Sequence, residues 1–211
     1  MKLYESLYIF LRYTQDIKYL MEIMIDLGYR ERKQNEWNLK DQAHYFALYN
    51  TILMNTCSYL DEYNKNFLAK AEPEFHERIL QIKKIAKPAF KKLNEWKDLK
   101  EYRNQMIAHN FRIDGNEFSF NMLGQYNAPR TYRDLALLRK HLAMVNAVIQ
   151  AEFESDMPNI NAFIKSFEVK EQEISYDNIE TDLKTMVAEI NQLCLDNGKT
   201  YQLPIEYFII L

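Results

Sequence analysis

Residues 38–67, NLKDQAHYFALYNTILMNTCSYLDEYNKNF, form a long stretch in which apolar side chains recur at the spacing of an α-helix. Asn38 is a favourable N-cap, and Asp41 stands three positions later, as in a capping box. From there the apolar stripe continues for about eight turns of helix. Its members are Leu39, Ala43, Phe46, Leu53, Cys57, Leu60 and Phe67. The stretch therefore predicts a long amphipathic helix at the centre of a helical fold.

The segments on either side predict further helices. Upstream, apolar residues recur at helical spacing over residues 2–27, and Gly28 ends this first helix. Downstream, Pro73 opens a new segment. Pro88 either starts another helix or kinks a continuous one, because proline lacks the backbone donor and clashes with the preceding turn. The helix that follows is expected to run to about Ala108.

The second half of the chain predicts a hairpin, a helix and an acidic extension. Residues 111–120 alternate apolar and polar side chains around an Asp-Gly-Asn turn, which is typical of a β-hairpin. Thr131 and Asp134 resemble a capping pair for a helix that runs to about Phe153. Residues 152–196 then hold eleven acidic and three basic side chains, with a helix expected over 177–197.

Composition agrees with an all-α fold. A chain of 211 residues with 47% hydrophobic content can build one sizeable core. Only four glycines and five prolines interrupt it, which favours long helices over tight turns. We therefore expect an up-and-down helical bundle of four to five main helices over residues 1–152, with a small β-hairpin insertion. The acidic helical extension, residues 153–211, is expected to pack on this bundle.

The same composition argues against several classes of protein. Cys57 and Cys194 follow no disulfide, metal or redox spacing, so we expect neither a metal site nor a cofactor. A reducing cytoplasm suits these two cysteines best. The apolar run at the N-terminus is too short for a secretory signal, and no run approaches the roughly 20 apolar residues of a membrane span. A cytoplasmic protein without membrane attachment is therefore expected.

Residues 101–112, EYRNQMIAHNFR, carry the strongest indication of chemistry. Arg103 falls inside an apolar stripe, between Leu99 one turn before it and Met106 one turn after it. Its guanidinium should therefore point at the core or at a partner surface rather than at water, and buried charges are almost always paired or used. His109 lies about 120° from Arg103 on an ideal helix. The two would meet only if the helix frayed or if a second copy of the chain supplied the other half.

Arg103, Asn104 and His109 stand in the order R-N-x-x-x-x-H, which resembles the motif of the HEPN superfamily. The resemblance covers residues 1–152 in pattern and about ten residues in identity. It implies a helical bundle that forms a homodimer, with the two motif helices lining one cleft. It also implies a metal-independent ribonuclease of a prokaryotic toxin, abortive-infection or antiviral defence system, with RNA as the substrate and an antitoxin as a partner. Other members of the superfamily are catalytically inactive and bind nucleotides or partners.

These three residue types suit the cleavage of RNA by its own 2′-hydroxyl. His109 could take or give a proton near neutral pH, because the unperturbed pKa of histidine is ~6.5. Arg103 could hold two oxygens of the scissile phosphate. Asn104 could orient the phosphate or His109. We therefore assign Arg103, Asn104 and His109 as the candidate catalytic residues.

The charge pattern adds candidate RNA contacts. Residues 78–112 contain ten basic and three acidic side chains, a net charge of +7 within a chain whose net charge is −3. Such a basic stripe suits a phosphate backbone, and Lys97, Lys100 and Arg112 lie closest to the motif. The stripe could equally be a solvated helix face whose lysines keep the surface soluble.

Two other hypotheses stay open at this point. The chain could be a catalytically inactive HEPN-like dimer that serves as an interaction or ligand-binding module. The motif could also be accidental in a helical scaffold, with Arg103 paired to a carboxylate such as Asp41, Asp61 or Glu62 and His109 stabilising the end of its helix. The remaining histidines have no second ligand at metal spacing and are expected to be surface or core residues. They are His44, His76 and His141.

Overall fold

The computed structural model describes residues 2–32, 34–104 and 126–165, together with ten residues between 181 and 196. The chain divides into two compact units, residues 1–167 and 168–211. In the second unit every described residue is helical, as predicted for these positions within 177–197. No β-strand occurs among the described residues, and the fold of the first unit is an all-α bundle, as predicted. The predicted hairpin at residues 111–120 lies outside the described part of the chain.

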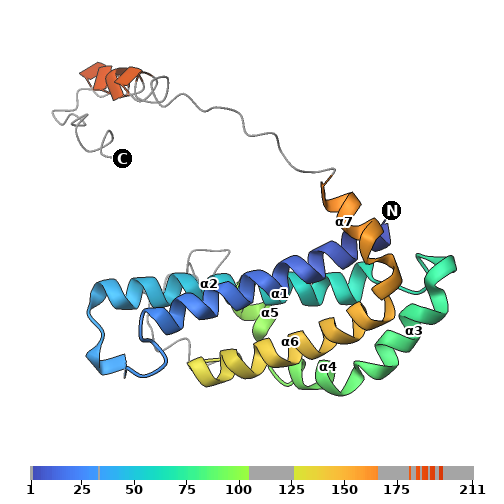
Figure 1. Ribbon diagram of the computed structural model, residues 1–211. Helices are drawn as coiled ribbons and strands as arrows, with labels where there is room; N and C mark the ends of the chain where they lie inside the picture. The colour runs from blue at the N-terminus through green and yellow to red at the C-terminus, as the bar shows by residue number, and fades with distance from the viewer. Residues whose placement is uncertain are drawn as a thin grey trace. The chain divides into compact units, whose positions relative to one another are not determined.

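The first two helices form an antiparallel pair joined by residues 27–38 (Figure 1). Helix α1 (Lys2–Asp26) is followed by Gly28, as predicted. The φ of Gly28 is 76°, a backbone conformation that residues with a Cβ atom rarely adopt. After the 3₁₀ turn η1 (Gln34–Glu36), the predicted capping box begins helix α2 (Leu39–Asp61). Asn38 accepts from the backbone of Asp41, and the Asp41 carboxylate accepts from the backbone of Asn38. One π-helical turn, η2 (Glu62–Asn66), extends the end of α2.

Short helices form the middle of the chain. The 3₁₀ turn η3 (Pro73–Phe75) leads into α3 (His76–Ile85), and Pro88 lies in the first turn of the separate helix α4 (Lys87–Leu93). Of the two alternatives for Pro88, a new helix is therefore the one observed. The helix α5 (Leu99–Tyr102) begins only after a break of five residues.

The helix expected to follow Pro88 and run to about Ala108 is interrupted, and its part beyond residue 104 lies outside the described residues. The chain turns at residues 94–98, and Asn127 fixes that turn from a distant part of the sequence. The Asn127 backbone N–H donates to the Asp98 carboxylate at 2.7 Å, and the Asn127 side chain donates to the carbonyl of Glu95 at 3.1 Å. Together with the bond from the Asp98 backbone N–H to the Asn127 carbonyl at 3.3 Å, they hold the turn in place. The apolar stripe still faces the core, because Leu93, Leu99 and Tyr102 are all buried.

Helix α6 (Tyr132–Glu152) returns along the bundle and contacts α1, α3 and α4. It begins with the predicted capping box of Thr131 and Asp134. The 3₁₀ turn η6 (Glu154–Asp156) and the helix α7 (Met157–Lys165) follow, and α7 contacts α1. Because Phe153 and Ile160 are fully buried, the compact unit extends past residue 152, where the sequence placed the domain boundary, to residue 167.

Aromatic side chains fill much of the core between α1 and α2. The ring of Phe10 lies 4.8 Å from that of Tyr59 and 5.3 Å from that of Phe67, and all three side chains are almost completely buried. Burial of such large rings contributes strongly to stability, by area and by tilted and edge-to-face contacts. The core fixes α2 against α1, and α5 packs against the C-terminal half of α2 (Figure 1).

Candidate functional site

Arg103 follows the last residue of α5 and pairs with Asp61, the last residue of α2. Its Nη1 donates to Asp61 Oδ2 at 3.2 Å, and 27% of its side chain is exposed. The guanidinium is thus half-buried and paired, as expected for an arginine within an apolar stripe. Asp61 is one of the three carboxylates that the sequence offered as partners.

Asn104 binds the other side of the same guanidinium. Its Oδ1 accepts from Arg103 Nε at 3.1 Å and from Arg103 Nη2 at 3.0 Å. All three guanidinium nitrogens therefore have a partner within the chain. The amide oxygen of Asn104 accepts two hydrogen bonds from one edge of the guanidinium, as one oxygen of a phosphate or carboxylate could.

Two lysines bring further positive charge to Asp61. Lys100 Nζ lies 2.5 Å from Asp61 Oδ1, and Lys65 Nζ lies 3.3 Å from Asp61 Oδ2. Burial by itself would raise the pKa of Asp61, but hydrogen bonds from Lys100 and Arg103 and the nearby positive charges lower this pKa to about 2. The carboxylate is therefore ionised at neutral pH. We call Asp61, Lys65, Lys100, Arg103 and Asn104 the Asp61 cluster; it holds three cations and one anion.

Buried neighbours hold α5 in place beneath this cluster. The Tyr102 hydroxyl donates to Asn50 Oδ1 at 3.2 Å, and the Cys57 thiol donates to the carbonyl of Leu99 at 3.6 Å. Burial raises the pKa of Tyr102 to about 12 and that of Cys57 to about 11, so both groups are neutral at physiological pH. With Leu99 and Tyr102 fixed inward, Lys100 and Arg103 are left at the surface of the bundle.

The structure therefore brings together three of the six predicted site residues: Lys100, Arg103 and Asn104. Lys97 is exposed in the turn before α5. His109 and Arg112 lie outside the described residues.

Lys65 was missed as a member of the site, and Asp61 was considered only as a structural partner. Their spacing carried one signal, because Asp61 and Lys65 stand at i and i+4, where side chains of opposite charge meet on a helical surface.

The predicted basic stripe is only partly available to a ligand. The guanidinium of Arg78 lies 4.1 Å from the centre of the Phe153 ring and 2.8 Å from Asp156 Oδ2, so its role is structural. Lys83 is half-buried, donates to the carbonyl of Tyr63 at 3.0 Å and lies over the Tyr63 ring. Burial lowers the pKa of Lys83. The stripe is thus interrupted at its N-terminal end, while the lysines near α5 stay exposed.

In the described part of the chain, no three histidine, cysteine or carboxylate side chains gather as a metal site would require. His76 Nδ1 lies 3.2 Å from the carbonyl of Ala69, which is a structural contact.

None of the helices in the described ranges is both long and apolar enough to cross a membrane.

Comparison of the chain with protein-family models, with curated proteins and with solved structures found no significant match. Its function is therefore inferred from the Asp61 cluster and from the motif in residues 103–109.

Proposed function

We propose that this chain is a cytoplasmic HEPN-type protein of a prokaryotic defence or toxin system that binds RNA and cleaves it without a metal ion. Two copies would form a homodimer in which Arg103 and His109 of both chains line one cleft. An antitoxin is the partner expected for such a protein. The observation that carries this proposal is the Asp61 cluster, in which the motif arginine lies among other cations at the surface of the bundle.

The charge of the cluster favours a phosphate ligand. Three cations surround one carboxylate, so the group has a net charge of +2 at neutral pH. Lys65 and Lys100 are 66% and 47% exposed, so a phosphate could approach both. Arg103 is already held in one orientation by Asn104, and a phosphate oxygen that replaced Asp61 at Nη1 would meet a guanidinium that needs little further ordering.

Each residue then has a role in the reaction. Arg103 and Lys100 would stabilise the negative charge that builds on the phosphorus oxygens as the 2′-hydroxyl attacks. His109 would act as the general acid or base, and the partner subunit would contribute the second of the two proton-transfer groups. Asn104 would orient Arg103. Lys97 and Arg112 would bind phosphates on either side of the cleavage point.

The experiment that tests this function is incubation of the full chain with total RNA and tRNA in EDTA. Wild-type protein should cleave, whereas Arg103→Ala and His109→Ala should each lose cleavage while keeping the helical circular dichroism of the wild type. Arg12→Ala is the matched control, because Arg12 is an exposed arginine on α1 whose ion pair with Asp16 lies within the same helix. Cleavage that survives both motif substitutions, or that requires a metal ion, would remove the proposed site.

One observation favours a second function. Every nitrogen of the Arg103 guanidinium already has a partner in Asp61 or Asn104, as it would in a motif kept for its structure. The alternative is therefore a catalytically inactive HEPN-like dimer that serves as an interaction or ligand-binding module. Intact RNA after incubation with wild-type protein, together with a dimer in sedimentation analysis, would favour this alternative.

A further inference from the structure

A separate cavity lies at the other end of α2. It is bounded by the C-terminal part of α1, the loop into α2 and the first turns of α6, and its volume is about 820 Å³. Ligand pockets commonly have volumes of roughly 300–1,000 Å³. Tyr45, which lines the cavity, precedes Asp61 by sixteen residues on α2, a separation of roughly 24 Å along the helix. The cavity is therefore distinct from the Asp61 cluster.

Basic side chains from two elements converge on this cavity. Of the described residues that line it, five are basic and none is acidic. Arg32 is paired with Asp41 at 2.7 Å, and Arg30 lies 3.6 Å from Glu31. The other three form no ion pair within the described part of the chain. They are Arg133, Arg139 and Lys140.

The Asp134 carboxylate of α6 interacts with Arg133 and offsets only part of this charge. Asp134 is held by the start of its own helix, where its Oδ2 accepts from the backbone N–H groups of Arg130 and Thr131 at 3.1 and 3.0 Å. Arg133 lies in the first turn of α6, and Arg139 and Lys140 follow about two turns further along the helix. Because none of the three forms an ion pair in the described part of the chain, together they make an attractive site for an anion. Arginine in particular matches the geometry of phosphate oxygens.

Aromatic side chains form the rest of the lining. Tyr29, Trp37 and Tyr45 lie together, with ring centres 5.1 Å apart for Tyr29 and Trp37 and 4.6 Å apart for Trp37 and Tyr45. Tyr132 lines the cavity from α6. The Trp37 Nε1–H is buried and has no hydrogen-bond partner among the described residues. Tyr29 and Tyr45 are only 3% exposed, so a planar ligand would lie against the partly exposed rings of Trp37 and Tyr132, and its acceptor would satisfy the Trp37 donor.

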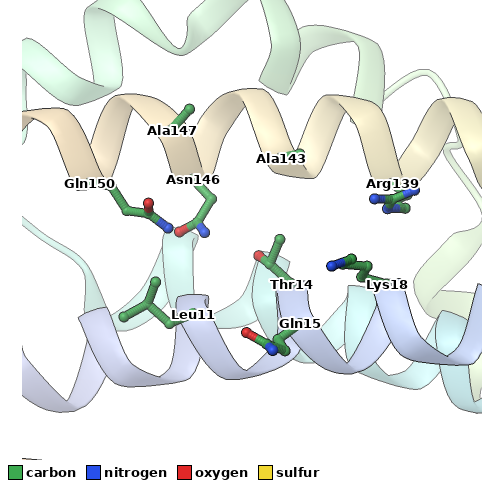
Figure 2. A pocket seen from close by; sticks show the side chains of 9 residues that line it. All are labelled: Leu11, Thr14, Gln15, Lys18, Arg139, Ala143, Asn146, Ala147 and Gln150. Atoms are coloured by element: carbon green, nitrogen blue, oxygen red, sulfur yellow. The ribbon is translucent and has the colours of Figure 1, made fainter. Parts of the chain in front are cut away.

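A smaller cavity lies between α1 and α6 (Figure 2), and Arg139 lines both cavities. Its volume is about 280 Å³. Asn146 lines it with only 5% of its surface exposed, and its Oδ1 is buried without a hydrogen-bond partner in the described part of the chain. Figure 2 shows Asn146 beside Gln150 on α6, both facing α1 across the gap. Buried acceptors are rarely left unsatisfied, so this amide could receive a ligand hydroxyl or amino group.

We propose that the larger cavity binds a nucleoside phosphate. The phosphates would lie on Arg133, Arg139 and Lys140, and the base would lie against the aromatic side chains around Trp37. Any of the bases can stack on an aromatic ring. The negative charge of the phosphates would balance the positive charge of the three cations. The same chemistry could come from a free nucleotide or from one unit of an RNA strand.

The first test uses Trp37 as a reporter. The chain contains two tryptophans, Trp37 and Trp96, so Trp96→Phe leaves Trp37 as the only source of tryptophan fluorescence. ATP, adenosine, inorganic phosphate and a single-stranded hexaribonucleotide are titrated separately. Saturable quenching by ATP identifies the free nucleotide, and quenching by the hexaribonucleotide alone identifies an RNA strand. Adenosine and phosphate should each bind much more weakly. A signal that neither ATP nor the hexaribonucleotide changes up to millimolar concentration would overturn the proposal.

The second test removes the unpaired cations. Arg133→Ala/Lys140→Ala should weaken binding of the effective ligand by about tenfold or more, because two charge-assisted contacts to phosphate are lost. Arg12→Ala/Lys92→Ala is the matched control, since it removes the same charge from exposed positions on α1 and α4. Both variants are checked by thermal unfolding. If the first unfolds early, Lys140→Ala alone, at an exposed position, replaces it and should weaken binding by a smaller factor. Equal affinity in the cavity variant and the control would overturn the proposal.

This site does not depend on the proposed nuclease. Arg103→Ala should keep the affinity for ATP that Trp37 fluorescence reports while losing RNA cleavage, and Arg133→Ala/Lys140→Ala should lose that affinity whether or not the chain cleaves RNA. Loss of ligand binding in Arg103→Ala would contradict a separate site.

Discussion

At the scale of single residues, Asp61 decides how Arg103 can act. Its carboxylate contacts Lys65, Lys100 and Arg103 at once, and it occupies the position that a phosphate oxygen would need. If the cluster binds RNA, Asp61 is an internal competitor that holds the cations in place until the strand arrives. If the cluster is structural, Asp61 is only the anion that holds the end of α2 to α5.

The lowered pKa of Asp61 predicts a pH dependence of stability. The folded pKa of about 2 lies below the unfolded value of about 3.9, so the stabilisation is fully present above pH ~4 and is lost as pH falls toward ~2. We expect it to be about 1 kcal/mol, because solvent screens the exposed lysines. Urea unfolding of wild type and Asp61→Asn from pH 7 to pH 2 measures it. The difference in free energy of unfolding between the two proteins should shrink between about pH 4 and pH 2. A constant difference would contradict a lowered pKa for Asp61.

Substitution of Arg78 and of Lys97 distinguishes basic residues that stabilise the fold from basic residues that bind RNA. Arg78→Ala should lower the free energy of unfolding by about 2 kcal/mol, because it removes an ion pair with Asp156 and a cation–π contact with Phe153. It should leave RNA affinity within twofold of wild type. Lys97→Ala, at an exposed position near α5, should lower the RNA affinity and leave the free energy of unfolding nearly unchanged. Chemical denaturation and filter binding measure the two quantities. A larger effect of Arg78→Ala than of Lys97→Ala on RNA affinity would show that the full basic stripe binds RNA.

Part of the site could be read from the sequence, and the rest required the fold. The apolar stripe predicted a partly buried, paired Arg103, because helical periodicity is a local property. It left three carboxylates as possible partners, since Asp61 precedes Arg103 by 42 residues and only tertiary structure could choose among them. The adjacent Asn104 was predicted as a site residue. Its hydrogen bond to the Arg103 guanidinium depends on side-chain geometry, which the spacing of residues in the sequence does not show.

At the scale of secondary-structure elements, local signals predicted helix starts well and missed one long-range break. Asn38 with Asp41, and Thr131 with Asp134, form the predicted capping boxes because every partner lies within four residues. The turn at residues 94–98 depends instead on Asn127, which lies 29 residues after Asp98. No helical pattern could reveal that interaction, because the apolar spacing continues through the turn.

The cap of α6 predicts a measurable loss of stability. Thr131→Ala should lower the free energy of unfolding by about 1 kcal/mol, because the backbone N–H of Asp134 loses its acceptor and the helix start frays. Thr51→Ala is the matched control, since Thr51 is partly exposed and its hydroxyl donates to the carbonyl of Ala47 within the same helix. We expect the control to stay within ~0.5 kcal/mol of wild type. Equal effects of the two substitutions in thermal unfolding would count against a stabilising cap.

At the scale of the whole molecule, the boundary after residue 167 separates one large core from the acidic C-terminal part. Composition had placed the change at residue 152, where acidic residues begin to dominate. Charge alone could not show that Phe153 and Ile160 are buried in the bundle, because single apolar residues in an acidic segment carry little pattern.

The boundary predicts that residues 1–167 fold alone. This fragment contains every residue of the large hydrophobic core cluster, so it should unfold cooperatively. Its melting temperature should lie within about 4 °C of that of the full chain, a difference that corresponds to less than about 1 kcal/mol. A fragment that ends at residue 152 lacks Phe153 and Ile160 and should melt much lower. Calorimetry of the three proteins measures this, and equal losses in both fragments would contradict the boundary.

The central claim is that the Asp61 cluster binds RNA phosphates, and the affinity of Asp61→Asn for RNA tests it most directly. The substitution keeps the shape of the side chain and frees three cations, so binding should tighten and its dependence on salt should steepen. Asp16→Asn makes the same change of charge at the Arg12 pair on α1 and serves as the control. A tighter complex for Asp61→Asn than for Asp16→Asn is the predicted result. Equal or weaker binding by Asp61→Asn would show that the cluster only holds the bundle together.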